Sequence, residues 1–176
     1  FLITDLPFLS FRKGVPAALD AVAAMMRAGA QAVKLEGVAG HEDVISAIAG
    51  SGVPVMGHLG LTPQSVNALA GYRVQGRSED AAARIVEDAK RLEALGCFSI
   101  VLECVPTALG ARITKTVGIP TIGIGAGAGC DGQVLVLQDL LGLSGGHRPK
   151  FVRTYLDGAR AVREAIDRFD IDVKQG

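Results

Sequence analysis

Short apolar runs alternate with amphipathic helical patterns along nearly the whole 176-residue chain. The runs are rich in Val, Ile and Leu at consecutive positions, which is typical of strands covered on both faces. This repeated alternation favours a parallel sheet whose strands are joined by right-handed helical crossovers. We predict strands over residues 1–4, 32–35, 53–56, 98–102, 121–124 and 133–137.

The segments between these runs carry apolar residues at helical spacing. The stripe over residues 79–95 is the clearest, and it ends before Gly96. No linker or change of composition divides the chain, so we predict one domain over residues 1–176. The other predicted helices cover residues 16–28, 42–49, 62–69, 107–116 and 157–173.

Two architectures fit this order of elements: an open doubly wound sheet and a (β/α)8 barrel. A barrel typically needs about 250 residues and eight strands. Six strands are predicted here, and the chain starts abruptly in an apolar run without Met. We therefore expect a barrel that lacks its first two β/α units.

Composition excludes several classes of protein. Hydrophobic residues make up 49% of the chain, enough for a real core. Lys plus Arg and Asp plus Glu both number 18, so nothing in the charge points to nucleic acid or a membrane surface. No apolar run approaches the roughly 18 residues of a membrane helix. Three cysteines without metal-site spacing fit a reducing cytoplasm.

Polar residues follow the apolar runs at their carboxyl ends: Asp5, Lys34, Glu36, His58 and Glu103. In a parallel barrel these ends meet on the face where active sites lie. Each residue also has a simpler interpretation. Asp5 could form a turn, Lys34 and Glu36 a surface pair, and Glu103 a structural ion pair.

Together these residue types favour one kind of chemistry. Asp5 and Glu36 offer hard oxygen ligands that suit Mg²⁺, and such an ion polarises a carbonyl oxygen. Lys34 can neutralise negative charge that develops nearby. Glu103, in the apolar stretch IVLECVP, is a candidate base for a proton alpha to that carbonyl. The prediction is metal-assisted enolisation of a 2-oxo acid, followed by attack on an electrophile.

The remaining histidines, glycines and cysteines give weaker indications of function. His41 and His147 fall in predicted loops, where we expect them to be solvated, whereas His58 is a candidate to line the site. Residues 123–129 read GIGAGAG, but a strand rather than a helix is predicted to follow, which disfavours a dinucleotide fingerprint. Cys104 is expected to be a packed thiol.

Several segments resemble the ketopantoate hydroxymethyltransferase family in consistent order. The most specific are GHLGLTPQSVN at 57–67 and IPTIGIGAGAGCDGQVLVLQDLLG at 119–142. DLPF, RAGAQAVKLEG, GYRVQGR and VLECVP match as well, at 5–8, 27–37, 71–77 and 101–106. The resemblance covers nearly the whole chain.

The resemblance implies a (β/α)8 TIM barrel of the phosphoenolpyruvate/pyruvate type. It implies transfer of a hydroxymethyl group from 5,10-methylenetetrahydrofolate to 3-methyl-2-oxobutanoate, giving 2-dehydropantoate for pantothenate synthesis. By motif, Asp5 resembles a residue that binds both Mg²⁺ and substrate, and Glu36 resembles a second metal ligand. Lys34 resembles the substrate-binding lysine of the family, and Glu103 resembles its proton acceptor. The family's usual assembly is a homodecamer.

The chain departs from the family pattern in several places. The first two β/α units and the family's last residues are missing, so we expect the barrel domain to be incomplete at the N-terminus and at the C-terminus. No Gly-Asp-Ser segment occurs, although the family uses one for a further metal ligand, and Val38 replaces a second Gly after VKLEG. These 176 residues alone are therefore expected to show weak or no catalysis. Two alternatives stay open: a Mg²⁺-dependent C–C lyase or mutase of the same barrel superfamily, and an inactive barrel fragment that only associates with subunits.

Overall fold

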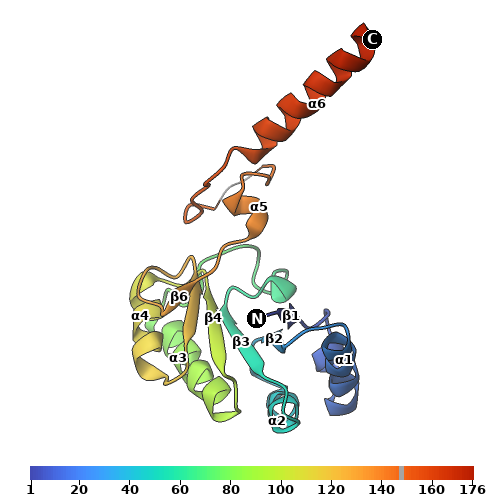
Figure 1. Cartoon of the computed structure of the whole chain (residues 1–176). Helices are drawn as coiled ribbons and strands as arrows, with labels where there is room; N and C mark the ends of the chain where they lie inside the picture. Colours follow the sequence, from blue (N-terminus) through green and yellow to red (C-terminus); the bar gives the residue numbers. More distant parts are fainter. Residues whose placement is uncertain (147–148) are drawn as a thin grey trace. The chain divides into compact units, whose positions relative to one another are not determined.

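The computed structural model describes residues 1–146 and 149–176, which divide into two compact units, Phe1–Gln133 and Val134–Gly176. The first unit contains one six-stranded sheet in which neighbouring strands in the sequence are neighbours in space. Every pair is parallel, and the sheet curls into a half-barrel (Figure 1). The strands are β1 (Ile3–Asp5), β2 (Ala32–Glu36), β3 (Val55–Gly60), β4 (Ser99–Glu103), β5 (Thr121–Ile124) and β6 (Gly132–Gln133).

Four helices connect these strands and cover one face of the sheet (Figure 1). They are α1 (Val15–Arg27), α2 (Glu42–Gly50), α3 (Glu79–Ala94) and α4 (Thr107–Thr116). Short 3-10 turns lie at Ser10–Arg12 and Pro63–Ser65. The main core lies between these helices and the sheet, where Ile45, Leu92 and Ile113 pack against strand residues such as Leu35 and Ile100.

The start and the end of α3 show how the sequence sets the element boundaries. Ser78 Oγ accepts a hydrogen bond from the backbone N–H of Ala81 over 3.3 Å, which caps the first turn. Gly96 follows the helix with φ of +94°, a conformation that most other residues avoid. Ala89 and Leu92 on its inner side are fully buried. Capping and burial therefore fix both the length and the rotation of this helix.

The opposite face of the sheet has a second, smaller apolar cluster. Met56, Val101 and Ile124 form it, with Ile3 and Ile122 packed alongside. Side chains alternate between the two faces of a strand. The polar residues two positions further along these strands therefore share this second face and lie at its carboxyl edge.

The predicted parallel α/β arrangement is confirmed, with three exceptions in its elements. The strand predicted over 53–56 begins two residues later and continues to Gly60 as β3. The strand predicted over 133–137 is limited to β6, and the chain enters the short helix α5 (Leu137–Leu140) instead. The helix predicted over 62–69 is reduced to the 3-10 turn Pro63–Ser65. These segments are short, so local propensity could not settle how far each element extends.

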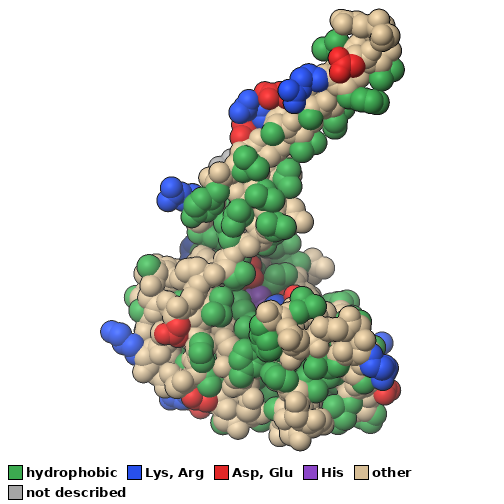
Figure 2. All heavy atoms as spheres, viewed as in Figure 1, with side chains coloured by type: hydrophobic (Ala, Val, Ile, Leu, Met, Phe, Trp, Pro, Cys, Tyr) green, Lys and Arg blue, Asp and Glu red, His purple; other side chains and the backbone are tan. Residues whose placement is uncertain are grey.

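The second unit contains α5 and the long helix α6 (Gly158–Gln175). Backbone hydrogen bonds from Gly158 to Leu141 and from Ala159 to Gly142 join the two helices. Hydrophobic side chains lie along one side of α6 and charged ones along another (Figure 2). In the described part of the chain, no helix combines the length and the apolar character needed to cross a membrane.

Candidate active site

The five polar residues predicted at strand ends come together on the sheet face that the helices leave uncovered. Asp5 of β1 stands opposite Lys34 of β2, and Glu36 stands opposite His58 of β3. Glu103 of β4 lies two residues beyond the position opposite His58 and stands opposite Gly60. The curled parallel sheet thus places the five side chains on one face at its carboxyl edge, as the sequence predicted.

Short contacts connect these side chains. Lys34 forms an ion pair with Asp5, and its Nζ lies 3.4 Å from His58 Nδ1. The other nitrogen of that ring, Nε2, lies 3.3 Å from Glu103 Oε2. The side chain of Asp5 is 57% exposed and that of Glu103 is 17% exposed. The two groups at the ends of the cluster therefore remain accessible to a small molecule.

Glu36 is the most enclosed carboxylate of the cluster, with 5% of the residue exposed. Burial raises the pKa of Glu36, while a hydrogen bond from the backbone of Gln64 and the charge of Lys34 oppose this rise. The Gln64 N–H donates to Glu36 Oε2 over 2.9 Å. A cation placed beside this carboxylate would offset the cost of keeping its charge buried.

Glu103 is held by the backbone around it. Its carbonyl oxygen accepts a hydrogen bond from the Leu61 N–H over 2.8 Å. The next residue, Cys104, adopts φ of +48°, and its N–H donates to Ile124 O over 2.9 Å. A left-handed conformation at a residue other than Gly costs about 1 kcal/mol or more. The sharp turn at Cys104 ends β4 directly after Glu103 and leaves this carboxylate at the edge of the sheet.

Two residues have a larger part in the site than sequence reasoning gave them. His58 was a candidate lining residue, and it lies at the centre of the cluster. Gln64 was not singled out at all. Its backbone N–H binds Glu36, and its side-chain amide donates to Leu6 O over 3.0 Å. No residue pattern could reveal a contact made by a backbone N–H, which every residue except Pro carries.

The expectation that His41 is solvated is wrong. The residue is 1% exposed and packs on Phe11, with ring centroids 5.1 Å apart. Burial, with the nearby charge of Arg12, lowers the pKa of His41. The loop after β2 packs against the 3-10 turn Ser10–Arg12, where Arg12 Nη1 donates to Ala39 O over 3.0 Å, and this contact encloses a side chain that local sequence places in a turn. The other predicted loop histidine, His147, lies outside the described residues.

The carboxylates of the cluster suit a hydrated hard cation better than a fully enclosed metal. Among residues 1–146 and 149–176, no group of three or more His, Cys, Asp or Glu side chains is arranged to hold a metal ion. Mg²⁺ commonly binds through one or two carboxylates and keeps water or substrate oxygens as its other ligands. Glu36 Oε1 lies 3.9 Å from His58 Nδ1, beyond hydrogen-bond distance, and is left for such an ion. The donor set of Asp5 and Glu36 therefore fits Mg²⁺.

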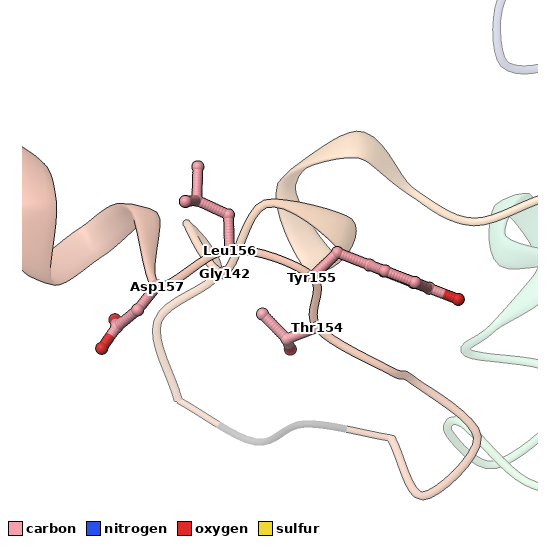
Figure 3. A pocket seen from close by; sticks show the side chains of 5 residues that line it. All are labelled: Gly142, Thr154, Tyr155, Leu156 and Asp157. Atoms are coloured by element: carbon pink, nitrogen blue, oxygen red, sulfur yellow. The ribbon is translucent and has the colours of Figure 1, made fainter.

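Two hollows are lined by residues other than those of the cluster. One, of about 410 Å³, belongs to the second unit and is lined by Gly142, Thr154, Tyr155, Leu156 and Asp157 (Figure 3). Asp157 is the only carboxylate among these lining residues, and no lysine or histidine accompanies it. The other, of about 210 Å³, lies between the starts of α3 and α4. Neither hollow brings together the acid and base groups found at the sheet edge.

Comparison with known proteins shows the family of the chain. The family model described as Ketopantoate hydroxymethyltransferase matches residues 1–176. The chain belongs to the ketopantoate hydroxymethyltransferase family. Among its relatives, proteins named 3-methyl-2-oxobutanoate hydroxymethyltransferase are 57% identical over 173 residues in Bdellovibrio bacteriovorus and 50% identical over 174 residues in Francisella tularensis. The alignments cover 98% and 99% of this chain. The chain spans 66% of the length of either relative.

Solved structures support the fold. A candidate phosphonomutase from Burkholderia cenocepacia has a TM-score of 0.52 with this chain at 18% sequence identity. The match covers 70% of this chain and 53% of that structure. At this identity the likeness concerns the fold alone. It supports a barrel-type arrangement of parallel strands and helices for the half-barrel seen here.

Proposed function

We propose that the protein transfers a hydroxymethyl group from 5,10-methylenetetrahydrofolate to 3-methyl-2-oxobutanoate and forms 2-dehydropantoate. The observation that carries this proposal is the cluster of Asp5, Lys34, Glu36 and Glu103 on one sheet edge. Membership of the family and the names of the relatives support the choice of substrates. The proposal includes closure of the half-barrel into a complete (β/α)8 barrel in the full-length protein.

In this proposal Asp5 and Lys34 bind the 2-oxo acid. Lys34 is 18% exposed at its side chain, so its ammonium group can reach a carboxylate at the open edge while it stays beside Asp5. Asp5 and Glu36 would hold Mg²⁺, which supplies Lewis-acid polarisation of the keto group when bound. The charges of the cluster thus hold the substrate with its C3 atom directed toward β4.

Glu103 is the proposed base. Its carboxylate removes the proton from C3, the C3–H electron pair forms the C2=C3 bond, and negative charge moves to the keto oxygen. Lys34 stabilises that charge. Water adds to the methylene carbon of the folate while its two C–N bonds break, and the two hydrogens of the water pass to the two nitrogens, so that formaldehyde and tetrahydrofolate form. The C2=C3 electron pair then bonds to the formaldehyde carbon, and the resulting alkoxide takes the proton held by Glu103. One 2-oxo acid, one methylenetetrahydrofolate and one water give 2-dehydropantoate and tetrahydrofolate.

Proton exchange tests this proposal without folate. The full-length protein is incubated with 3-methyl-2-oxobutanoate and Mg²⁺ in deuterated water, and the C3 proton is followed by NMR. We expect deuterium at C3, and loss of exchange when a chelator removes Mg²⁺. An unlabelled C3 would contradict the proposal. If 2-dehydropantoate forms after 5,10-methylenetetrahydrofolate is added, the protein is a transferase and not a lyase or mutase. If the keto acid binds only in the presence of Mg²⁺, the protein is not an inactive fragment.

The resemblance also implies a homodecamer, and the three cysteines without metal-site spacing favour a cytoplasmic location. We include both in the proposal. Analytical ultracentrifugation of the full-length protein tests the assembly. A species of ten subunits is expected, and a stable monomer at micromolar concentration would contradict it.

A further inference from the structure

His58 occupies the middle of the site, between the proposed base and the proposed ligands of substrate and metal. It is 2% exposed and lies on β3, where it stands opposite Glu36 of β2 and Val101 of β4. A histidine buried this completely needs partners for both ring nitrogens. The identity of those partners indicates what the residue does.

The Nδ1 side of the ring faces a donor. Lys34 Nζ lies 3.4 Å from His58 Nδ1. A lysine ammonium group has three hydrogens to donate and no lone pair to accept with, so Nδ1 must be the acceptor in this contact. In the neutral imidazole the single ring hydrogen then resides on Nε2. Lys34 therefore selects one of the two tautomers of His58.

The Nε2 side of the ring faces the proposed base. Nε2 lies 3.3 Å from Glu103 Oε2, but the direction of approach falls short of a hydrogen bond, and this buried nitrogen has no hydrogen-bond partner. The side chain of Glu103 is partly exposed and less confined than the ring. A rotation of the carboxylate toward Nε2 would satisfy the buried N–H and would fix the carboxylate plane.

We propose that His58 is a positioning residue: Lys34 holds the ring hydrogen on Nε2, and this N–H orients the Glu103 carboxylate toward the C3 proton of the substrate. With one oxygen engaged by Nε2, the other is directed to the open edge. This inference rests on the proposed function, because it concerns the geometry of the base in that reaction. A purely structural histidine would fill the same space without any effect on Glu103.

Kinetics distinguish the two roles. His58→Leu removes the ring N–H, and we expect the C3 exchange rate to fall roughly 10-fold or more while the affinity for the 2-oxo acid changes less than about 3-fold. His58→Gln restores an N–H donor at a similar reach and should recover part of the rate. In the Glu103→Gln background His58→Leu should cause no further loss, because residues that act as a unit are not additive.

The other buried histidine is the matched control. His41→Leu makes the same substitution at a residue that is 1% exposed but packs on Phe11 away from Glu103. It should lower the melting temperature and leave the exchange rate unchanged. The positioning role alone would be overturned if His58→Leu exchanged the C3 proton at the full rate. It would also be overturned if His58→Leu lowered the exchange rate by the same factor in the wild-type and in the Glu103→Gln background. Absence of exchange in the wild-type protein would overturn the proposed function, and the positioning role with it.

The tautomer can be measured without any reaction. Imidazole ¹⁵N shifts of His58 in the full-length protein should show a protonated Nε2 and an unprotonated Nδ1. Lys34→Met removes the donor and should shift the ring toward a mixture of tautomers. A wild-type ring protonated on Nδ1 would overturn the assignment whatever the kinetics show.

Discussion

The backbone N–H of Gln64 donates a hydrogen bond to Glu36 Oε2 over 2.9 Å. The segment after β3 thus reaches back to the carboxylate at the end of β2. Gln64 also holds Leu6 O, directly after β1, through its side chain. One residue therefore ties together the edges of three strands, and it encloses the carboxylate that we propose as a metal ligand.

The enclosure of Glu36 predicts a pH effect on stability. Because burial raises the pKa of Glu36, the folded state binds this proton more tightly than the unfolded state. Protonated Glu36 therefore contributes favourably to the stability of the fold below its ordinary pKa of 4.5. This contribution is lost as the pH rises through the pKa of Glu36 in the folded state. Glu36→Gln has no such titration. Its melting temperature relative to the wild type should therefore increase from pH about 4.5 to about 7 without divalent ions. Thermal unfolding checks this, and a constant or falling difference would contradict it.

Asp5→Ala should weaken the binding of Mg²⁺ and of the 2-oxo acid together. The substitution removes one of the two proposed metal ligands and the ion-pair partner of Lys34. Titration calorimetry of the full-length protein should show at least a roughly 10-fold loss for both. Asp20→Ala, on the exposed surface of α1, is the control and should change neither affinity. Unaltered Mg²⁺ binding by Asp5→Ala would remove Asp5 from the metal site.

Glu103→Gln should separate binding from chemistry. The amide keeps the size of the side chain but cannot accept the C3 proton, so the exchange rate should fall by roughly 10²-fold or more. Affinity for the 2-oxo acid should stay nearly unchanged, because Asp5 and Lys34 are intact. Glu87→Gln makes the same change at an exposed position of α3 and should exchange normally. If Glu103→Gln keeps full exchange, another group is the base.

Gly60→Ala should damage both the fold and the site. Gly60 has φ of +92°, and a Cβ atom there would overlap the carbonyl oxygen of Glu103 and lie 2.8 Å from Val105 Cγ1. The backbone of β4 would have to move, so we expect a loss of more than about 2 kcal/mol in unfolding free energy. Gly52→Ala is matched in φ, +85°, but has nothing within 4 Å of the new Cβ. It should cost only about 1 kcal/mol for the backbone strain. Equal losses in chemical denaturation would refute the steric argument.

Cys97 should resist alkylation in the folded protein. The residue is 3% exposed, and burial raises the pKa of its thiol to about 12. At pH about 8 only about one molecule in 10⁴ would carry the reactive thiolate, even before access is considered. Iodoacetamide followed by mass spectrometry should leave Cys97 unmodified until denaturant is added, whereas Cys130 is less enclosed and should react first. Rapid native labelling of Cys97 would contradict its placement in the core.

Much of the first unit follows from patterns that are local in the sequence. The apolar stripe of α3, its Ser78 cap and the Gly96 stop each act within a few residues, and this helix was predicted within one residue of its bounds. The same-side placement of Lys34 and Glu36 follows from the two-residue period of a strand. Where a pattern was short, as over 133–137, the prediction failed, because too few residues contributed to it.

The sequence by itself determined the order of strands and helices, the family, and which polar residues end the strands. Only the tertiary structure decided that His58 lies between Lys34 and Glu103, that the Gln64 backbone encloses Glu36, and that His41 is buried. The physical reason is the range of the interactions. Propensity and periodicity act between near neighbours in the chain, whereas hydrogen bonds across the sheet edge and the desolvation of a side chain depend on segments that meet only after folding.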